Sequence, residues 1–299
     1  MSENGAARSY YGQPILKEPV WTPEIPIYFF AGGMAGASAG LGYLAGLRGN
    51  DELARRAWAA AMGGVGVSPA LLISDLGRPA RFLNMLRLFK VTSPMSVGSW
   101  ILSAFGAATT VAAASAWTDR VPRAAGRAAR PVAALLGLPL ATYTAALLTN
   151  TAIPVWHEAR GRLAFVFAAG AAASAGAVAV VLTPPGHAAP ARRLAVGGAA
   201  LELAATELME RSLGELGEPY RQGPAGALAK LALGLTAAGG ATIAARGRRS
   251  RTAAVAGGTL LAAGALAERW SIYRAGFQSA ADPKYVVEPQ RARRAAAAT

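Results

Sequence analysis

Ionisable side chains inside apolar segments are the residues of this chain that could do chemistry. Glu202, Glu207 and Lys230 each lie in a stretch made mostly of Ala, Gly and Leu. An ionised group within a membrane-spanning helix costs about 2.5–3.5 kcal/mol on insertion scales, so such groups usually handle ions or protons. We therefore interpret the three residues as a candidate proton relay. Glu202 is the strongest candidate of the three, because no basic residue lies three or four positions from it to form an ion pair on the same helix.

Glu207 and Lys230 each have a simpler interpretation. Glu207 and Arg211 are four residues apart, which allows an ion pair along one face of a single helix. The long side chain of Lys230 could instead reach back to the membrane surface with its charged end. Both alternatives stay open at the level of the sequence.

The residue types also exclude several redox sites. The 299 residues include no Cys and only two His, and both His157 and His187 fall between apolar segments. Iron–sulfur clusters are held mainly by cysteine thiolates, and a membrane-embedded haem needs axial ligands on helices. We expect no haem, no iron–sulfur cluster and no bound metal in this chain. If the protein handles electrons, a diffusible partner must carry them.

The elements that position these residues are apolar and long. The chain is 53% hydrophobic and only 15% charged, and about 20 apolar residues suffice for a helix to cross a bilayer. The pattern predicts an all-α, multi-pass integral membrane bundle of eight transmembrane helices. Their expected ranges are 25–47, 54–74, 96–117, 131–153, 162–183, 191–210, 224–246 and 252–273. The sixth and seventh carry charges, so six or seven spans is the competing count.

An even count places both termini on the same side of the membrane. We call this side A; it holds 1–24, 75–95, 154–161, 211–223 and 274–299. Side B holds the short turns 48–53, 118–130, 184–190 and 247–251, which are dense in arginine. Positive charge in short loops marks the cytoplasmic face, so we predict that side A is extracytoplasmic. The net charge of +14 is then explained by topology and lipid headgroups, and we expect no nucleic-acid partner.

The expected organisation has three parts. An extracytoplasmic arm (1–24) precedes the membrane domain (25–273), and an extracytoplasmic tail (274–299) follows it. The part of this tail beyond Ala280 is expected to be disordered or a docking arm. Within the membrane domain, 78–90 alternates apolar and basic residues and is predicted to be an amphipathic helix at the interface. Almost every polar group within the spans falls in their side A half, which predicts a site that opens toward side A.

Three stretches of the first half resemble a known family. They are Asp75-Leu-Gly-Arg-Pro-x-Arg-Phe-x-Asn-Met-Leu, Ser93-Pro-Met-Ser-x-Gly-Ser-Trp and Tyr143-Thr-Ala-Ala-Leu-Leu-x-Asn-Thr-Ala-Ile-Pro-Val-Trp. With the opening Tyr11-Gly-x-Pro-x-Leu-Lys-x-Pro-x-Trp, they are similar to the NrfD/PsrC family of membrane subunits in polysulfide reductase-like molybdoenzyme complexes. The resemblance covers about residues 10–160.

The resemblance implies a function. Such a subunit anchors the complex in the cell membrane and exchanges electrons between an exchangeable quinone, menaquinone or ubiquinone, and a docked four-cluster ferredoxin-like iron–sulfur subunit. That subunit serves a molybdopterin catalytic subunit, polysulfide reductase-like or formate dehydrogenase-like. The chain would not be catalytic alone. Two alternatives from the residues themselves are a proton-coupled transporter and a purely structural membrane anchor.

The resemblance also implies a quinone site near side A. Tyr143 matches the Tyr-Thr motif of the fourth span and is the expected partner of a quinone carbonyl, although Ala145 stands where family members commonly have Gly. The further candidates for quinone binding are Tyr28, Asp75, Arg78, Asn84 and Asn150. For Asp75 and Arg78, a salt bridge that fixes the loop is the alternative role.

Overall fold

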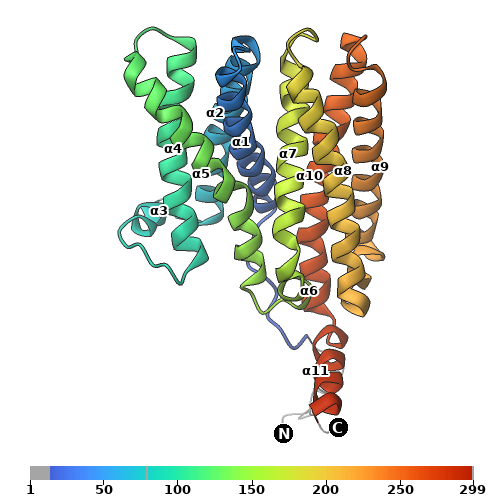
Figure 1. Cartoon of the computed structure of the whole chain (residues 1–299). Helices are drawn as coiled ribbons and strands as arrows, with labels where there is room; N and C mark the ends of the chain where they lie inside the picture. The colour runs from blue at the N-terminus through green and yellow to red at the C-terminus, as the bar shows by residue number, and fades with distance from the viewer. Residues whose placement is uncertain (1–13, 79, 298–299) are drawn as a thin grey trace, which may run out of the picture.

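The computed structural model describes residues 14–78 and 80–297, and every regular element in these residues is helical. The long helices stand side by side in one bundle (Figure 1). They are α1 (Glu24–Leu47), α2 (Asp51–Asp75), α4 (Pro94–Trp117), α5 (Arg123–Thr149), α7 (Leu163–Leu182), α8 (Ala189–Leu213), α9 (Gly223–Arg246) and α10 (Arg251–Ala281). The short ones are α3 (Ala80–Met85), α6 (Pro154–Glu158), α11 (Lys284–Ala297) and the 3-10 turns η1 (Ala159–Gly161) and η2 (Gly214–Tyr220).

Six of the described helices are long and apolar enough to cross a membrane: α1, α2, α4, α5, α7 and α9. The prediction of an all-helical membrane protein is confirmed. Helices α8 and α10 have 25 and 31 residues, which is also long enough for a bilayer, but both carry buried charges. The count of eight spans therefore stays a prediction.

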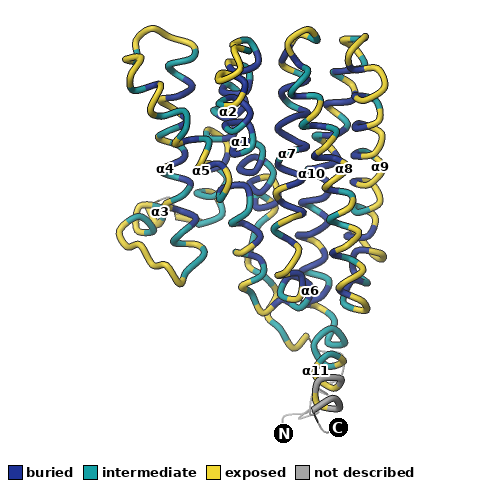
Figure 2. The backbone as a smooth tube through the Cα atoms, in the orientation of Figure 1, coloured by how far each residue is buried: buried dark blue, intermediate teal, exposed yellow. Residues whose placement is uncertain are grey.

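The chain runs up and down through the bundle. Figure 1 places α3, α6 and α11 at the same end, as expected for side A, while short turns join the helices at the opposite end. Figure 2 shows that α1, α7 and α10 are largely buried and that α9 is more exposed. Whether side A faces out of the cell stays a prediction.

Polar caps and close backbone contacts explain the local structure. The side chains of Asn50, Ser93 and Ser250 each accept a hydrogen bond from a backbone N–H in the first turn of α2, α4 and α10, which satisfies a donor that has no partner within the helix. Between helices, a Cβ at Gly36 of α1 would collide with the backbone of Gly137 of α5. The glycine spacing of the first span thus serves close helix packing.

The predicted amphipathic helix over 78–90 is too long. The helix extends only over α3, its residues are not buried, and Pro79 lies outside the described residues. The chain leaves the helix because Ser96 of α4 offers other hydrogen bonds. Its hydroxyl donates to the Leu88 carbonyl at 3.0 Å and accepts from the Lys90 N–H at 3.0 Å. The segment after Met85 therefore folds back onto the start of α4.

The two ends of the described chain are held by side chains. Trp21, before α1, stacks on Trp156 of α6 with ring centroids 5.2 Å apart, and its carbonyl accepts a hydrogen bond of 2.6 Å from the Tyr273 hydroxyl. Within the expected tail, α10 continues to Ala281 and α11 follows, so residues 284–297 are helical. Tyr11, where the first similar motif opens, lies outside the described residues.

Candidate functional site

Polar groups gather in two places in the side A half of the bundle. The first is the region where the similar motifs meet. Tyr143 lies less than two turns from the end of α5, and Gly98 lies about one turn into α4. A Cβ at position 98 would lie only 2.7 Å from Cδ2 and 2.8 Å from Cζ of the Tyr143 ring. The absence of a side chain at Gly98 therefore allows the tyrosine ring to lie against α4.

Two buried hydroxyls lie near this end of α1 and α2. Tyr28 and Ser68 are each 1% exposed, and within the described residues neither hydroxyl has a hydrogen-bond partner. A Cβ at Gly32 would lie 3.7 Å from Ser68 Oγ and 4.0 Å from Tyr28 Cε2, so both side chains border the same glycine. A buried polar group without a partner costs about 1–3 kcal/mol. Such hydroxyls are suited to bind a ligand or a water molecule.

Asp75 ends α2 and holds the arm that precedes α1. Its Oδ1 accepts hydrogen bonds from the backbone N–H of Thr22 at 3.0 Å and from the Thr22 hydroxyl at 2.7 Å. Arg78 is exposed and makes no salt bridge with Asp75 or with any other acid that the structure describes. The loop is therefore fixed by Thr22, and the alternative salt bridge is not formed.

The two asparagines do not converge on this region. Asn84 is exposed in α3. Asn150 is exposed as well, and its side-chain amide donates a hydrogen bond of 2.8 Å to the Ala146 carbonyl of its own helix. Of the six candidates for quinone binding, Tyr28 is buried, Asp75 and Tyr143 are partly buried, and Arg78, Asn84 and Asn150 are exposed.

The second place is a charged cluster between α7, α8 and α10. Glu202, Glu268 and Arg269 are 2%, 5% and 3% exposed. A Cβ at Gly170 of α7 would collide with both the Glu202 carboxylate and the Arg269 guanidinium. The glycine thus provides the space in which these opposite charges approach each other. Arg269 also donates to the Phe167 carbonyl at 3.2 Å, and its guanidinium lies 4.1 Å above the Phe167 ring.

The charges in this cluster are close but not fully paired. In the part of the chain that the structure describes, both carboxylate oxygens of Glu202 and Nη1 of Arg269 have no hydrogen-bond partner. Glu268 accepts a hydrogen bond of 3.4 Å from the Thr206 hydroxyl. Buried carboxylates with unused acceptor capacity can bind water or take up a proton without breaking a strong ion pair.

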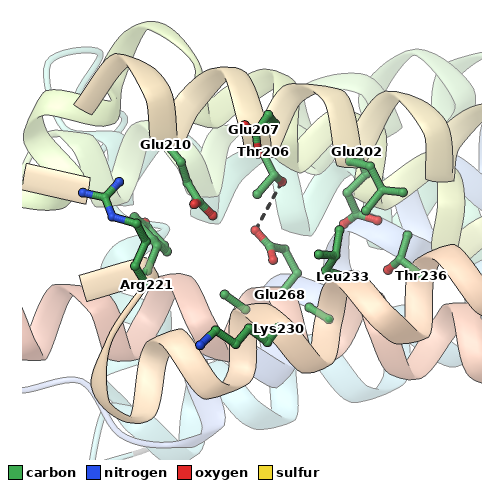
Figure 3. A pocket seen from close by; sticks show the side chains of 13 residues that line it. Glu202, Thr206, Glu207, Glu210, Arg221, Lys230, Leu233, Thr236 and Glu268 are labelled. Carbon is green, nitrogen blue, oxygen red and sulfur yellow. Dashed lines mark hydrogen bonds between the residues drawn. The ribbon is translucent and has the colours of Figure 1, made fainter. Parts of the chain in front are cut away.

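A cavity of about 330 Å³ adjoins this cluster. Figure 3 shows Glu202, Glu268 and Glu210 along it, with Arg221 near the Glu210 end and Lys230 on the α9 side. Its polar lining residues are Glu202, Thr206, Glu207, Glu210, Tyr220, Arg221, Lys230, Thr236 and Glu268. Successive carboxylates therefore lead from the buried middle of α8 toward its side A end.

The three predicted relay residues differ in their surroundings. Glu202 is buried, as its interpretation required. Glu207 forms the simpler alternative, an ion pair with Arg211 at 2.6 Å, and its side chain is 59% exposed. Lys230 is exposed at the rim of the cavity. The predicted relay omits Glu210, although the spacing of Glu202, Thr206 and Glu210 by four residues places all three on one helix face.

Residues 14–192 match the family described as polysulphide reductase, NrfD. The chain belongs to the NrfD family. The match extends over more than half of the 299 residues, and it confirms the resemblance seen in the three motifs. No curated protein matches the chain.

The two polar regions relate differently to the NrfD match. Tyr28, Asp75, Gly98 and Tyr143 all lie inside it, whereas Glu202 and Glu268 lie beyond its last residue. With its six apolar helices, this NrfD protein is a membrane protein. The matched part thus includes the Tyr143 region, and the charged cavity belongs mainly to the part of the chain that follows.

Proposed function

We propose that this chain is the membrane-anchor and quinone-reacting subunit of a respiratory oxidoreductase complex in the cytoplasmic membrane, with side A facing outward. On side A it would contact a four-cluster ferredoxin-like iron–sulfur subunit, which connects it to a molybdopterin enzyme of the polysulfide reductase or formate dehydrogenase type. The observation that carries this proposal is the contact between Tyr143 and Gly98, which joins two stretches that both lie within the NrfD match, at the side A end.

The hydroxyls of Tyr143, Tyr28 and Ser68 are the groups that would hold a quinone in this proposal. A bound menaquinone or ubiquinone supplies two-electron, two-proton chemistry, and its two ring oxygens need hydrogen-bond donors. The Tyr143 hydroxyl would donate to one oxygen. The unpartnered, buried hydroxyls of Tyr28 and Ser68 supply donors on α1 and α2 for the other. Asp75 keeps Oδ2 free of hydrogen bonds to the described residues while Thr22 holds Oδ1, so it can exchange a proton at the membrane surface.

Proton movement would use the second polar region. Glu202, Glu268 and Glu210 border one cavity, and a carboxylate with an unpartnered oxygen can accept a proton and release it to the next group or to water. Lys230, at the rim of the cavity, would partly neutralise the negative charge of these carboxylates. Glu207 would take part in the relay where the cavity meets side A. The reduction potentials of the partner subunits would set the direction of electron flow.

The proposal is tested by the Tyr143→Phe variant in the reconstituted complex. We expect quinone turnover to fall while the reaction of the catalytic subunit with an artificial dye is unchanged, because only the hydrogen bond to the quinone is removed. Tyr43→Phe is the matched control, since Tyr43 borders a different cavity toward the side B end. Quinone turnover that is unchanged in Tyr143→Phe would contradict the site.

The charged cavity also supports a second candidate, a proton-coupled transporter. Such a protein would need the buried acids of α8 and α10 but no redox partner. Co-purification separates the two functions: we expect iron–sulfur and molybdopterin subunits to accompany the chain. A chain that purifies alone and moves protons in vesicles would favour the transporter. A purely structural anchor would retain full quinone turnover in both Tyr143→Phe and Glu202→Gln.

A further inference from the structure

A separate groove of about 910 Å³ lies between α1, α5, α7 and α8. Most of its lining is small or apolar, including Gly40 and Leu44 of α1, Leu138 of α5 and Ala172 of α7. Gly40 leaves open space in this groove, because a Cβ there would meet no atom within 4 Å. Gly36, one turn earlier, instead packs directly on α5.

The groove opens sideways toward the surface that lipid would cover. Leu44 and Leu138 on its walls are 52% and 67% exposed. Helices α1, α5 and α7 are all among the helices that can span a membrane. An apolar chain can therefore enter the groove directly from the hydrocarbon layer.

The side B end of the groove is positively charged. Arg48 follows the last residue of α1, and Arg193 lies in the first turns of α8; both border the groove and both are exposed. In the described residues neither guanidinium has an acidic partner, and the lining includes no Asp or Glu. The neighbouring Asn50 is already engaged, because its amide donates to the His187 carbonyl at 2.9 Å. Two free arginines thus stand at one end of an apolar groove.

We propose that this groove binds one anionic phospholipid. An acyl chain would lie along Gly40, Leu44 and Leu138, and the headgroup phosphate would contact Arg48 and Arg193. Arginine matches phosphate well because its planar guanidinium donates two parallel hydrogen bonds. Two uncompensated positive charges favour a headgroup with net negative charge over a zwitterionic one. The lipid would bridge α1 and α5 to α7 and α8, and this proposal is independent of the quinone site.

The test uses the full-length chain, delipidated in detergent and titrated with phosphatidylglycerol or phosphatidylcholine, with bound lipid counted by native mass spectrometry. We expect one phosphatidylglycerol to be retained. The double variant Arg48→Gln with Arg193→Gln should bind it about tenfold or more weakly, as two charge-assisted contacts are lost. The charge-matched control is Arg246→Gln with Arg249→Gln: Arg246 ends α9, Arg249 lies in the turn that follows, and neither lines the groove.

A second variant tests the groove itself. Gly40→Leu should fill the groove and remove the bound lipid, while thermal unfolding shows that the chain still folds. Gly63→Leu is the matched control, because a Cβ at Gly63 of α2 also meets nothing within 4 Å. Three outcomes would overturn the proposal: equal retention of phosphatidylcholine, equal loss in the control variants, or full retention in Gly40→Leu, which would mean that the headgroup binds to the surface arginines alone.

Discussion

The ring of Tyr143 occupies the place where a side chain at Gly98 would have to stand. This relationship links α5 to α4 at the end of the bundle where Tyr28 and Asp75 also lie. It explains why a glycine is suited to the Ser-x-Gly-Ser-Trp stretch: any Cβ there would displace Tyr143, whose hydroxyl is proposed to donate to one quinone oxygen. The position of the ring, and not only the presence of the hydroxyl, should therefore control quinone turnover.

Gly98→Ala tests this relationship. The added methyl group must push the Tyr143 ring away from α4, and a displacement of about 1 Å in a reacting site can reduce the rate about 100-fold. We expect quinone turnover in the reconstituted complex to fall strongly, with dye activity retained. Gly106→Ala on the same helix is the control, because its Cβ would make an ordinary contact of 3.6 Å with Val65. Equal activities of the two variants would contradict a positioning role for Gly98.

The sequence predicts the helical segments well, because long apolar runs between arginine-rich turns can hardly form anything else in a membrane. It also predicts the burial of Glu202, since no base on the same helix could pair with it. The prediction for 78–90 is wrong beyond Met85 for a specific reason. The hydroxyl of Ser96 competes for the backbone of Leu88 and Lys90, and periodicity in 78–90 carries no information about a residue outside that segment.

Contacts between distant segments could not be predicted in the same way. The approach of Glu202 to Arg269 depends on Gly170, on a third helix, and no spacing along the chain relates these residues. Similarly, Asp75 has candidate partners nearby in the sequence, yet it bonds Thr22 across the bundle end. Lys230 lies inside an apolar run but is exposed, because its position relative to the neighbouring helices decides its burial.

The buried charges should depend on one another for stability. Arg269→Gln leaves Glu202 and Glu268 buried without their neighbouring cation, and an uncompensated buried charge is costly. We expect a marked loss of thermal stability in the detergent-purified chain. The double variant Glu202→Gln with Arg269→Gln should regain much of it, because both charges are removed together. A double variant less stable than Arg269→Gln would show that the pair is not coupled.

Glu202→Gln alone tests the relay. It keeps the size of the side chain but cannot exchange a proton, so we expect slower proton-coupled quinone turnover with unchanged dye activity. Glu215→Gln, in the exposed part of η2, is the control. Proton uptake measured in proteoliposomes reads the effect directly, and wild-type rates in Glu202→Gln would remove this residue from the relay.

Gly276→Ala should destabilise the contact between α6 and α10. The indole of Trp156 donates a hydrogen bond of 2.7 Å to the Ile272 carbonyl, and a Cβ at Gly276 would lie 2.6 Å from the indole nitrogen. Overpacking of this kind costs about 1–3 kcal/mol, more than the gain of up to about 1 kcal/mol from replacing Gly by Ala in a helix. We expect thermal unfolding at lower temperature.

Gly234→Ala is the matched control for this change. A Cβ at Gly234 of α9 meets nothing within 4 Å, so only the gain in helix propensity remains and stability should be equal or higher. If Gly276→Ala were as stable as Gly234→Ala, the indole could move away freely, and Trp156 would not fix α6 to α10.

The attachment of α11 should depend on pH through Glu218 and Lys284. Lys284 Nζ lies 2.7 Å from Glu218 Oε2, and the Tyr285 hydroxyl donates to the same oxygen at 3.1 Å. The hydrogen bond from Lys284 lowers the pKa of Glu218, and that from Tyr285 adds to this effect; the same contact with Glu218 raises the pKa of Lys284. Both shifts mean that the docked state of α11 favours the charged forms.

The sign of the pH effect follows from these two shifts. The lowered pKa of Glu218 means that its carboxylate stabilises the docked helix fully when the pH is above the ordinary glutamate pKa of about 4.3. This stabilisation is lost as the pH falls through the lowered pKa. The stabilisation that accompanies the raised pKa of Lys284 is fully present below about pH 10.4 and is lost as the pH rises through the raised pKa. We expect α11 to be held most firmly between these limits.

Because the chain has no Cys, Arg291→Cys can take a single spin label whose mobility reports docking. Glu218→Gln should make the label mobile at neutral pH, whereas Glu215→Gln should not; a label equally immobile in both variants would mean that other contacts hold α11.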